Sequence, residues 1–364
     1  MNTFIKSIFF ADFSCGDIDF LYKMLYNIHM RYLSKKIFKE NKNMENIKAK
    51  FHLPGLTHNF RMNMLLISMF EKSPQFFRDN VEIASCFGAF PPSVWNGGRP
   101  IGGFTCAPDY VEGVVKTLNS HGIPVRFTFT NPLITEEHLK DPYCNMVMKI
   151  ANNGMNEVIV FSPILEDYIR NTYPDYKITS STCKRITDAK ELDEELNKDY
   201  KIVVLDYDLN NRWDILDKLP HKEKCEFLAN SSCIPNCQKR TAEYETVGRQ
   251  MIAYNEHLIA YPDKPFNMAD YSDVTMSKDF NCPAMHRTPF DIRSLRQHIS
   301  PELIDNEYLP RGFNQFKLSG RGTGRLWVLE TYMYYFMKPE CRDEARFYFL
   351  HNLDNQGIIK IDDK

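Results

Sequence analysis

Three cysteines have the spacing to gather at one metal centre. Cys233 and Cys237 lie one helical turn apart in the segment NSSCIPNCQKR, and Cys282 follows in a long loop. The segment comes directly after a predicted strand and opens a predicted helix, whose amino terminus lowers the pKa of a nearby thiol and favours the thiolate that binds metal. Zinc sites more often use two pairs of ligands with two-residue gaps, so zinc is the less favoured metal. The pattern predicts a metal or iron–sulfur site.

The identity of a fourth ligand stays open. Cys225 is close in sequence, but it falls within a predicted strand, where a cysteine is also a common small buried side chain. Cys86, on another predicted strand, could reach the same end of the sheet. A cluster with three cysteines and one open iron is also chemically possible. We take Cys225 as the predicted fourth ligand beside Cys233, Cys237 and Cys282.

Polar and cationic side chains follow several predicted strands at the point where each strand ends. They are Asn96, Arg99, Asn131, Lys317 and Arg321. Arginine offers fixed donors for a carboxylate or phosphate, and lysine offers a mobile point charge. Because the carboxyl ends of the strands in a β/α barrel meet at one mouth, we expect these residues to face a common cavity and to bind a polar or anionic substrate. The residue types alone assign no catalytic residue.

A regular alternation of short β-branched or aromatic segments with amphipathic stretches predicts a parallel sheet. The predicted strands are Phe51–Leu56, Val81–Gly88, Val125–Thr130, Glu157–Ser162, Lys177–Ser181, Lys201–Asp206, Lys224–Ala229 and Gln315–Ser319. The predicted helices are at about 59–72, 108–121, 143–152, 163–172, 188–198, 210–217, 238–257 and 324–338. Pro108 and Pro163 near helix starts, and Asp188 as an N-cap, fit these boundaries.

Eight β/α units of this length predict a closed (β/α)8 barrel of the TIM type. An open doubly wound sheet would usually have a glycine-rich turn after its first strand, and the segment PGLTH there is no such turn. We place the barrel at residues 49–350, with an insertion at 258–312 that contains Cys282 and could cap one mouth. Residues 1–48 read as a helical or partly disordered extension, and residues 351–364 as a tail.

Composition is that of an ordinary globular protein. The chain has 364 residues, of which 43% are hydrophobic and 25% charged, and a formal net charge of −2 excludes any argument for nucleic acid or an anionic membrane from overall charge. No stretch approaches the ~20 apolar residues of a membrane span, and the start of the chain lacks an export signal. We therefore expect a cytoplasmic protein whose ten cysteines stay reduced.

Three ordered segments near the carboxyl end resemble one known family. They are MSKDFNC at 276–282, PELI at 301–304 and FKLSGR at 316–321. The chain is similar there to the peptidase U32, or collagenase-like, family, which reads Ser-Pro-Lys-Asp-Leu-Cys, Pro-Glu-Leu and Phe-Lys-Ile-Glu-Gly-Arg. Cys233 and Cys237 match the place of cysteines after the seventh barrel strand of that family.

The resemblance implies a fold and several activities. It implies a TIM-barrel-like fold, a [4Fe–4S] cluster and oxygen-independent hydroxylation of RNA or of a small aromatic precursor, with peptidase activity as the older assignment. The leading hypothesis is thus an iron–sulfur-dependent enzyme that acts on a polar or anionic substrate. The alternatives are a U32-type peptidase and a non-catalytic barrel with a structural metal and a binding role. No His-Glu-x-x-His or Gly-x-Ser-x-Gly motif supports hydrolysis.

Overall fold

The computed structural model describes residues 47–99, 104–271, 274, 282, 284 and 286–360. The chain divides into two compact units, Met1–Ile47 and Lys48–Lys364, and every described helix and strand belongs to the second. The predicted amino-terminal extension lies almost entirely outside the described residues. Among the described residues, no helix has both the length and the apolar character needed to cross a membrane.

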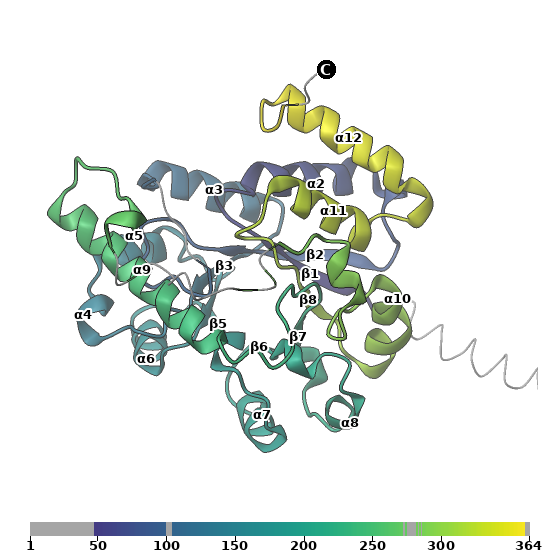
Figure 1. Ribbon diagram of the computed structural model, residues 1–364, viewed down its shortest axis with the longest axis horizontal. Helices are drawn as coiled ribbons and strands as arrows, with labels where there is room; N and C mark the ends of the chain where they lie inside the picture. The colour runs from purple at the N-terminus through teal and green to yellow at the C-terminus, as the bar shows by residue number, and fades with distance from the viewer. Residues whose placement is uncertain are drawn as a thin grey trace, which may run out of the picture. The chain divides into compact units, whose positions relative to one another are not determined.

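Parallel strands form a closed barrel, as the sequence predicted (Figure 1). Each strand pairs with the next along the chain, and β8 pairs with β1 to close the ring. All eight overlap the predicted segments. Their bounds are β1 (Ala49–Pro54), β2 (Val81–Gly88), β3 (Val125–Phe129), β4 (Glu157–Val160), β5 (Lys177–Ser180), β6 (Ile202–Val204), β7 (Cys225–Leu228) and β8 (Gln315–Lys317).

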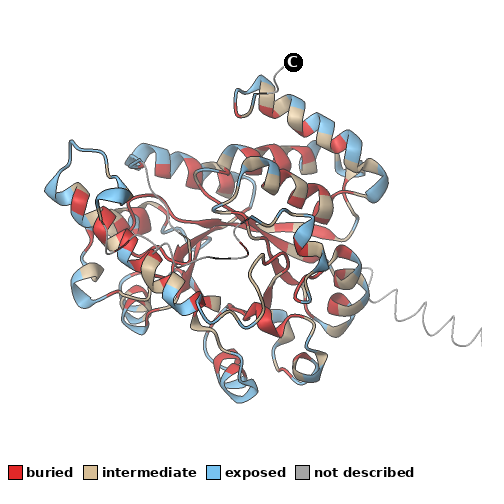
Figure 2. Ribbon diagram, in the orientation of Figure 1, coloured by how far each residue is buried: buried red, intermediate tan, exposed pale blue. Residues whose placement is uncertain are grey.

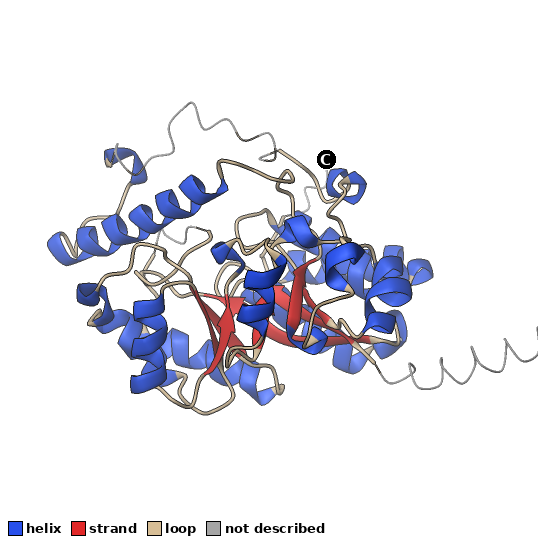
Figure 3. Cartoon of the chain, turned by 90° about the horizontal axis from the view of Figure 1, so that it is seen from below, coloured by secondary structure: helices blue, strands red, loops and turns tan. Residues whose placement is uncertain are grey.

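Helices surround the strands, and the side of each helix that faces the barrel is buried while its outer side is exposed (Figures 2 and 3). The helices that alternate with the strands also match the predicted segments. Their bounds are α2 (Phe60–Lys72), α3 (Pro108–Ser120), α5 (Pro142–Ile150), α6 (Pro163–Thr172), α7 (Ala189–Leu196), α8 (Trp213–Leu216), α9 (Arg240–Ala260) and α11 (Arg325–Phe336).

Local chemistry explains where several helices begin. Pro108 and Pro163 occupy the first position of α3 and α6, where proline's missing N–H would have no partner in any case. The Asp188 carboxylate accepts hydrogen bonds from the backbone N–H groups of Lys190 and Glu191 and so caps α7. The predicted roles of these two prolines and of Asp188 are confirmed.

Among the described residues, three α-helical segments were not predicted. They are α4 (Glu136–Leu139), α10 (Pro301–Leu303), which continues as a π-helical turn at Ile304–Tyr308, and α12 (Arg342–Asn355). Helix α12 lies beside α11 and is joined to it by a 2.5 Å ion pair between Arg346 and Glu330 (Figure 1). The predicted tail therefore begins inside a helix, whose buried residues Ala345, Phe349 and Leu353 recur every fourth position.

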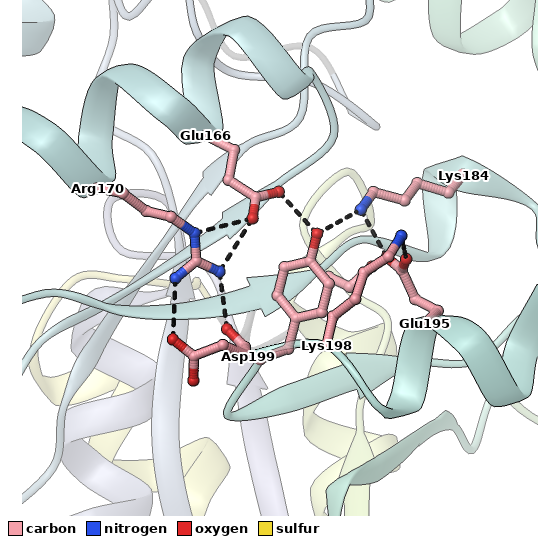
Figure 4. Close-up of polar contacts among 8 residues, drawn as sticks. Glu166, Arg170, Lys184, Glu195, Lys198 and Asp199 are labelled. Carbon is pink, nitrogen blue, oxygen red and sulfur yellow. Dashed lines mark hydrogen bonds and ion pairs between the residues drawn. The ribbon is translucent and has the colours of Figure 1, made fainter.

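The loop after β5 is fixed by a buried carboxylate on α7 (Figure 4). Glu195 accepts hydrogen bonds from Ser180 Oγ at 2.5 Å and from the ammonium groups of Lys184 and Lys198 at 2.6 Å each. Burial opposes ionisation of Glu195, but the hydrogen bonds from Lys184, Lys198 and Ser180 outweigh it and lower the pKa to about 2. The ionised carboxylate thereby holds the short helix Thr182–Lys184 at the end of β5.

The predicted insertion is tied to the loop that follows β7. The Arg287 guanidinium donates to the backbone carbonyls of Ser232 at 2.6 Å and Cys233 at 3.2 Å. The Gln297 side-chain amide donates to the same Cys233 carbonyl at 2.5 Å. These contacts bring described parts of the insertion to the carboxyl end of the barrel, where the sequence predicted them.

Candidate substrate cavity at the barrel mouth

A cavity of about 480 Å³ lies at the carboxyl ends of the strands. Val204, Leu228 and Lys317, which are the last residues of β6, β7 and β8, line it. Cys282 and Ala284 of the insertion also line it. Active sites of TIM barrels are built at this face, so the cavity is the candidate functional site of the chain.

Three predicted cations line this one cavity. They are Arg99, Lys317 and Arg321. Among the described residues that line the cavity, Glu243 is the one carboxylate, and it lies 3.3 Å from the Arg99 guanidinium. The structure thus brings the three cations together with a net excess of positive charge, as the sequence led us to expect. Their role in binding a substrate stays a prediction.

Arg321 is held by neutral acceptors. Its guanidinium donates to Asn96 Oδ1 at 3.2 Å, to Thr128 Oγ1 at 2.7 Å and to the Gly97 carbonyl at 3.1 Å. Within the described part of the chain, no carboxylate lies at ion-pair distance from it. Burial, together with the nearby charge of Arg99, lowers the pKa of Arg321 to about 10. Arg321 is therefore a fixed cation with room for an anionic partner.

Asn96 positions these arginines and does not line the cavity. Its side chain is fully buried, and its amide donates to the Arg99 carbonyl at 2.9 Å. Its oxygen accepts from Thr128 Oγ1 at 3.0 Å as well as from Arg321. Because these partners occupy both ends of the amide, the structure does not place Asn96 where the prediction of substrate contact put it.

Asn131 has a similar positioning role. It is fully buried, and its amide donates to the carbonyls of Val94 at 2.8 Å and Gly248 at 3.3 Å. Its oxygen accepts the backbone N–H of Leu133 at 3.0 Å. Asn131 thereby joins the loop after β3 to helix α9, and it lies outside the cavity lining.

We expect Gly248→Ala to lower the free energy of unfolding by about 1–3 kcal/mol through overpacking. The new Cβ would lie 2.4 Å from Asn131 Oδ1, an atom already held by its own hydrogen bond. The matched control is Gly113→Ala in α3, where the Cβ would meet nothing within 4 Å and the helix should gain about 0.5–1 kcal/mol. Urea unfolding measures both. A Gly248→Ala variant as stable as the wild type would show that α9 moves away from Asn131 without cost.

A buried ion cluster lies inside the barrel beneath the cavity. Glu226 is fully buried, 2.5 Å from the Arg126 guanidinium, 3.1 Å from His52 Nε2 and 3.7 Å from Lys317 Nζ. Burial opposes its ionisation, but Arg126, His52 and Lys317 together lower its pKa to about 2. The cluster of Arg126, Glu226 and His52 was not predicted, although a charged residue within an otherwise apolar strand indicates a buried ion pair.

Lys317 extends from this cluster into the cavity. Its ammonium lies 4.1 Å from the centre of the Phe87 ring and 3.7 Å from Glu226 Oε1. It donates no hydrogen bond to any residue in the described part of the chain. Burial lowers the pKa of Lys317 to about 7, against the opposing effect of Glu226. The cavity therefore contains an amine that changes its charge near neutral pH.

The predicted metal ligands occupy different surroundings. Cys233 and Cys282 line the cavity and Cys237 does not, whereas Cys225 is the first residue of β7, at the amino end of that strand. Burial raises the pKa of Cys233, which disfavours the thiolate a metal needs. Among the described side chains, no group of three or more His, Cys, Asp or Glu residues is arranged to hold a metal ion.

The described residues thus show no assembled metal centre. The [4Fe–4S] cluster, with zinc as its alternative, stays a prediction from the sequence. Anaerobic purification followed by visible absorption and by iron and sulfide analysis tests it directly. A third cavity thiol, Cys183, was not singled out by the sequence because it lies in a short helical turn rather than in a cysteine motif.

Comparisons with known proteins assign no family. No family model and no curated protein matches the sequence. One solved structure, the U32 peptidase Mk0906, matches with a TM-score of 0.44 and 13% sequence identity, over 76% of this chain and 95% of that chain. The residues that line the cavity are therefore the basis for inferring a function.

Proposed function

We propose that the chain is an enzyme that binds a small anionic substrate in the cavity at the barrel mouth. The observation that supports this most is Arg321, a guanidinium held in place by neutral acceptors and facing the cavity, with no described carboxylate as its partner. A carboxylate or phosphate would supply the missing counter-charge and accept the two parallel hydrogen bonds that arginine offers.

The size and lining of the cavity favour a small organic anion. A volume of about 480 Å³ lies in the usual range for small-molecule sites. Apolar side chains from four strands complete the lining, and they are Phe87, Ile159, Val204 and Leu228. The described lining includes thiols and hydroxyls but no histidine, so no thiol–histidine or hydroxyl–histidine pair supports the peptidase alternative.

Calorimetric titration of malonate or inorganic phosphate, at constant ionic strength, tests this proposal. We expect Arg321→Met to weaken binding about 10-fold to 100-fold, which corresponds to the loss of one charge-assisted hydrogen-bonding group. Arg321→Lys should recover only part of the affinity, because it restores the charge but not the planar fork. Circular dichroism confirms that each variant is folded.

The matched control is Arg212→Met, which removes a surface guanidinium paired with Asp214. It should leave the affinity unchanged. Equal affinity for Arg321→Met and Arg212→Met would contradict anion binding at this cavity.

A further inference from the structure

We infer that Lys317 is a catalytic nucleophile whose amine forms an imine with a carbonyl carbon of the bound substrate. The inference rests on the proposed function, because the anionic end of that substrate is held by Arg321. It narrows the substrate class to short carbonyl compounds with a carboxylate or phosphate, such as 2-oxo acids.

The position of Lys317 favours this role. It is the last residue of β8, so its backbone is fixed by the barrel, and its side chain lines the cavity. Its ion-pair partner, Glu226 Oε1, is 3.7 Å away, beyond hydrogen-bond distance. The amine therefore donates no hydrogen bond to a described residue, and a ligand in the cavity can reach it.

The charges around Lys317 favour the neutral amine that a nucleophile needs. Glu226 already compensates the Arg126 guanidinium at 2.5 Å, so it compensates a lysine charge only in part. Burial lowers the pKa of Lys317 to about 7, so about half of the molecules hold the neutral amine at neutral pH. The groups that act on this pKa besides Glu226 are Arg126 and Arg321, which lower it, and Cys183, which raises it.

The chemistry is complete without another reactant. The lone pair of the Lys317 nitrogen attacks the carbonyl carbon, and the resulting carbinolamine loses the former carbonyl oxygen together with the two amine hydrogens as water. The nitrogen of the imine that forms then takes up a proton, which gives an iminium ion. Glu226, at 3.7 Å, then faces a positive charge at the place where the ammonium stood.

The Phe87 ring lies near both Lys317 and Arg321, which limits the length of a substrate that reaches both. The Lys317 ammonium lies 4.1 Å and the Arg321 guanidinium carbon 5.8 Å from the centre of this one ring. A short molecule can therefore place an anionic group against Arg321 and a carbonyl carbon against Lys317. The aromatic face and the adjacent aliphatic side chains would contact the carbon chain between them.

Reductive trapping tests the inference. The full chain is incubated with pyruvate and sodium cyanoborohydride, and the modified lysine is located by peptide mass spectrometry. We expect Lys317 to be labelled about 100-fold faster than surface lysines at neutral pH, because far more of its amine is deprotonated. The labelling rate should rise with pH and level off above the Lys317 pKa of about 7.

Two variants and a second probe distinguish the possible results. Lys317→Met should lose the adduct, and Lys116→Met, which removes an exposed lysine on α3, should keep it. Arg321→Met should slow labelling by pyruvate more than labelling by propanal, which has no charge and reports only the change in the Lys317 pKa. If propanal labels Lys317 but Arg321→Met does not slow labelling by pyruvate more than labelling by propanal, imine formation is supported and anion binding by Arg321 is disproved. If malonate binds and neither carbonyl compound labels Lys317 faster than surface lysines, anion binding stands and the imine is disproved.

Discussion

Glu226→Gln is expected to lower the free energy of unfolding by about 3–5 kcal/mol, one of the two largest effects in the molecule. The carboxylate is fully buried and compensates the charges of Arg126, at 2.5 Å, and of Lys317, at 3.7 Å. Gln keeps the volume and removes the charge, so the buried amine of Lys317 loses its carboxylate partner and Arg126 keeps, among the described carboxylates, only Glu157, at 3.3 Å. Urea unfolding at neutral pH measures the loss.

The pH dependence identifies the cause of this loss. The folded pKa of Glu226 is about 2, below its ordinary value of 4.5, so its stabilising contribution is present above 4.5 and is lost as the pH falls toward 2. The difference between wild type and Glu226→Gln should therefore shrink over that range. Glu112→Gln, at an exposed ion pair with Lys116, should change stability by less than about 0.5 kcal/mol. A difference that stays constant with pH would mean that altered packing, and not charge, is responsible.

Periodicity allowed most of the fold to be predicted. Val81–Gly88 and Pro163–Thr172 were predicted with the same bounds as observed, because a buried parallel strand and a proline-started helix leave clear local signals. Helix α12 was missed, since Arg342–Asn355 contains many polar residues and only a narrow buried stripe. The turn at Ile304–Tyr308 could not be read, because π-helical turns depend on tertiary contacts more than on composition.

The residues of the site could be predicted only where the barrel topology determines which way a side chain points. Lys317 ends a strand of the barrel, so the mouth is the place for its side chain. Asn96 and Asn131 also follow strands, but their amides turned to backbone partners, which no spacing pattern reveals. Cys225 begins β7, as the predicted strand Lys224–Ala229 implied, so it lies at the amino end of the strand and away from the mouth that Cys233 and Cys282 line.

Arg240→Met is the second substitution expected to cost about 3–5 kcal/mol of unfolding free energy. Arg240 is the first residue of α9 and is almost fully buried, and its guanidinium donates to both carboxylate oxygens of Asp206, one of them at 3.1 Å. The guanidinium carbon also lies 4.1 Å from the centre of the Tyr207 ring, which lines the cavity. Asp206 follows β6, and the structure assigns it to this pair.

Acid should partly rescue Arg240→Met. Burial already raises the pKa of Asp206 above its ordinary 3.8 against the opposing effect of Arg240, and removing Arg240 raises it further. A carboxyl group whose folded pKa is raised takes up a proton on folding, so stability falls as the pH rises through that window. The variant should therefore lose less stability, relative to wild type, at about pH 5 than at about pH 8.

The control for this pair is Arg212→Met, which breaks an exposed ion pair with Asp214 and should leave stability nearly unchanged at either pH. An Arg240→Met variant whose loss is the same at both pH values would show that the unpaired Asp206 carboxylate is not the source of the instability. Lost packing on Tyr207 would then be the cause, and it would be detected as a change in the cavity, through weaker malonate binding at every pH.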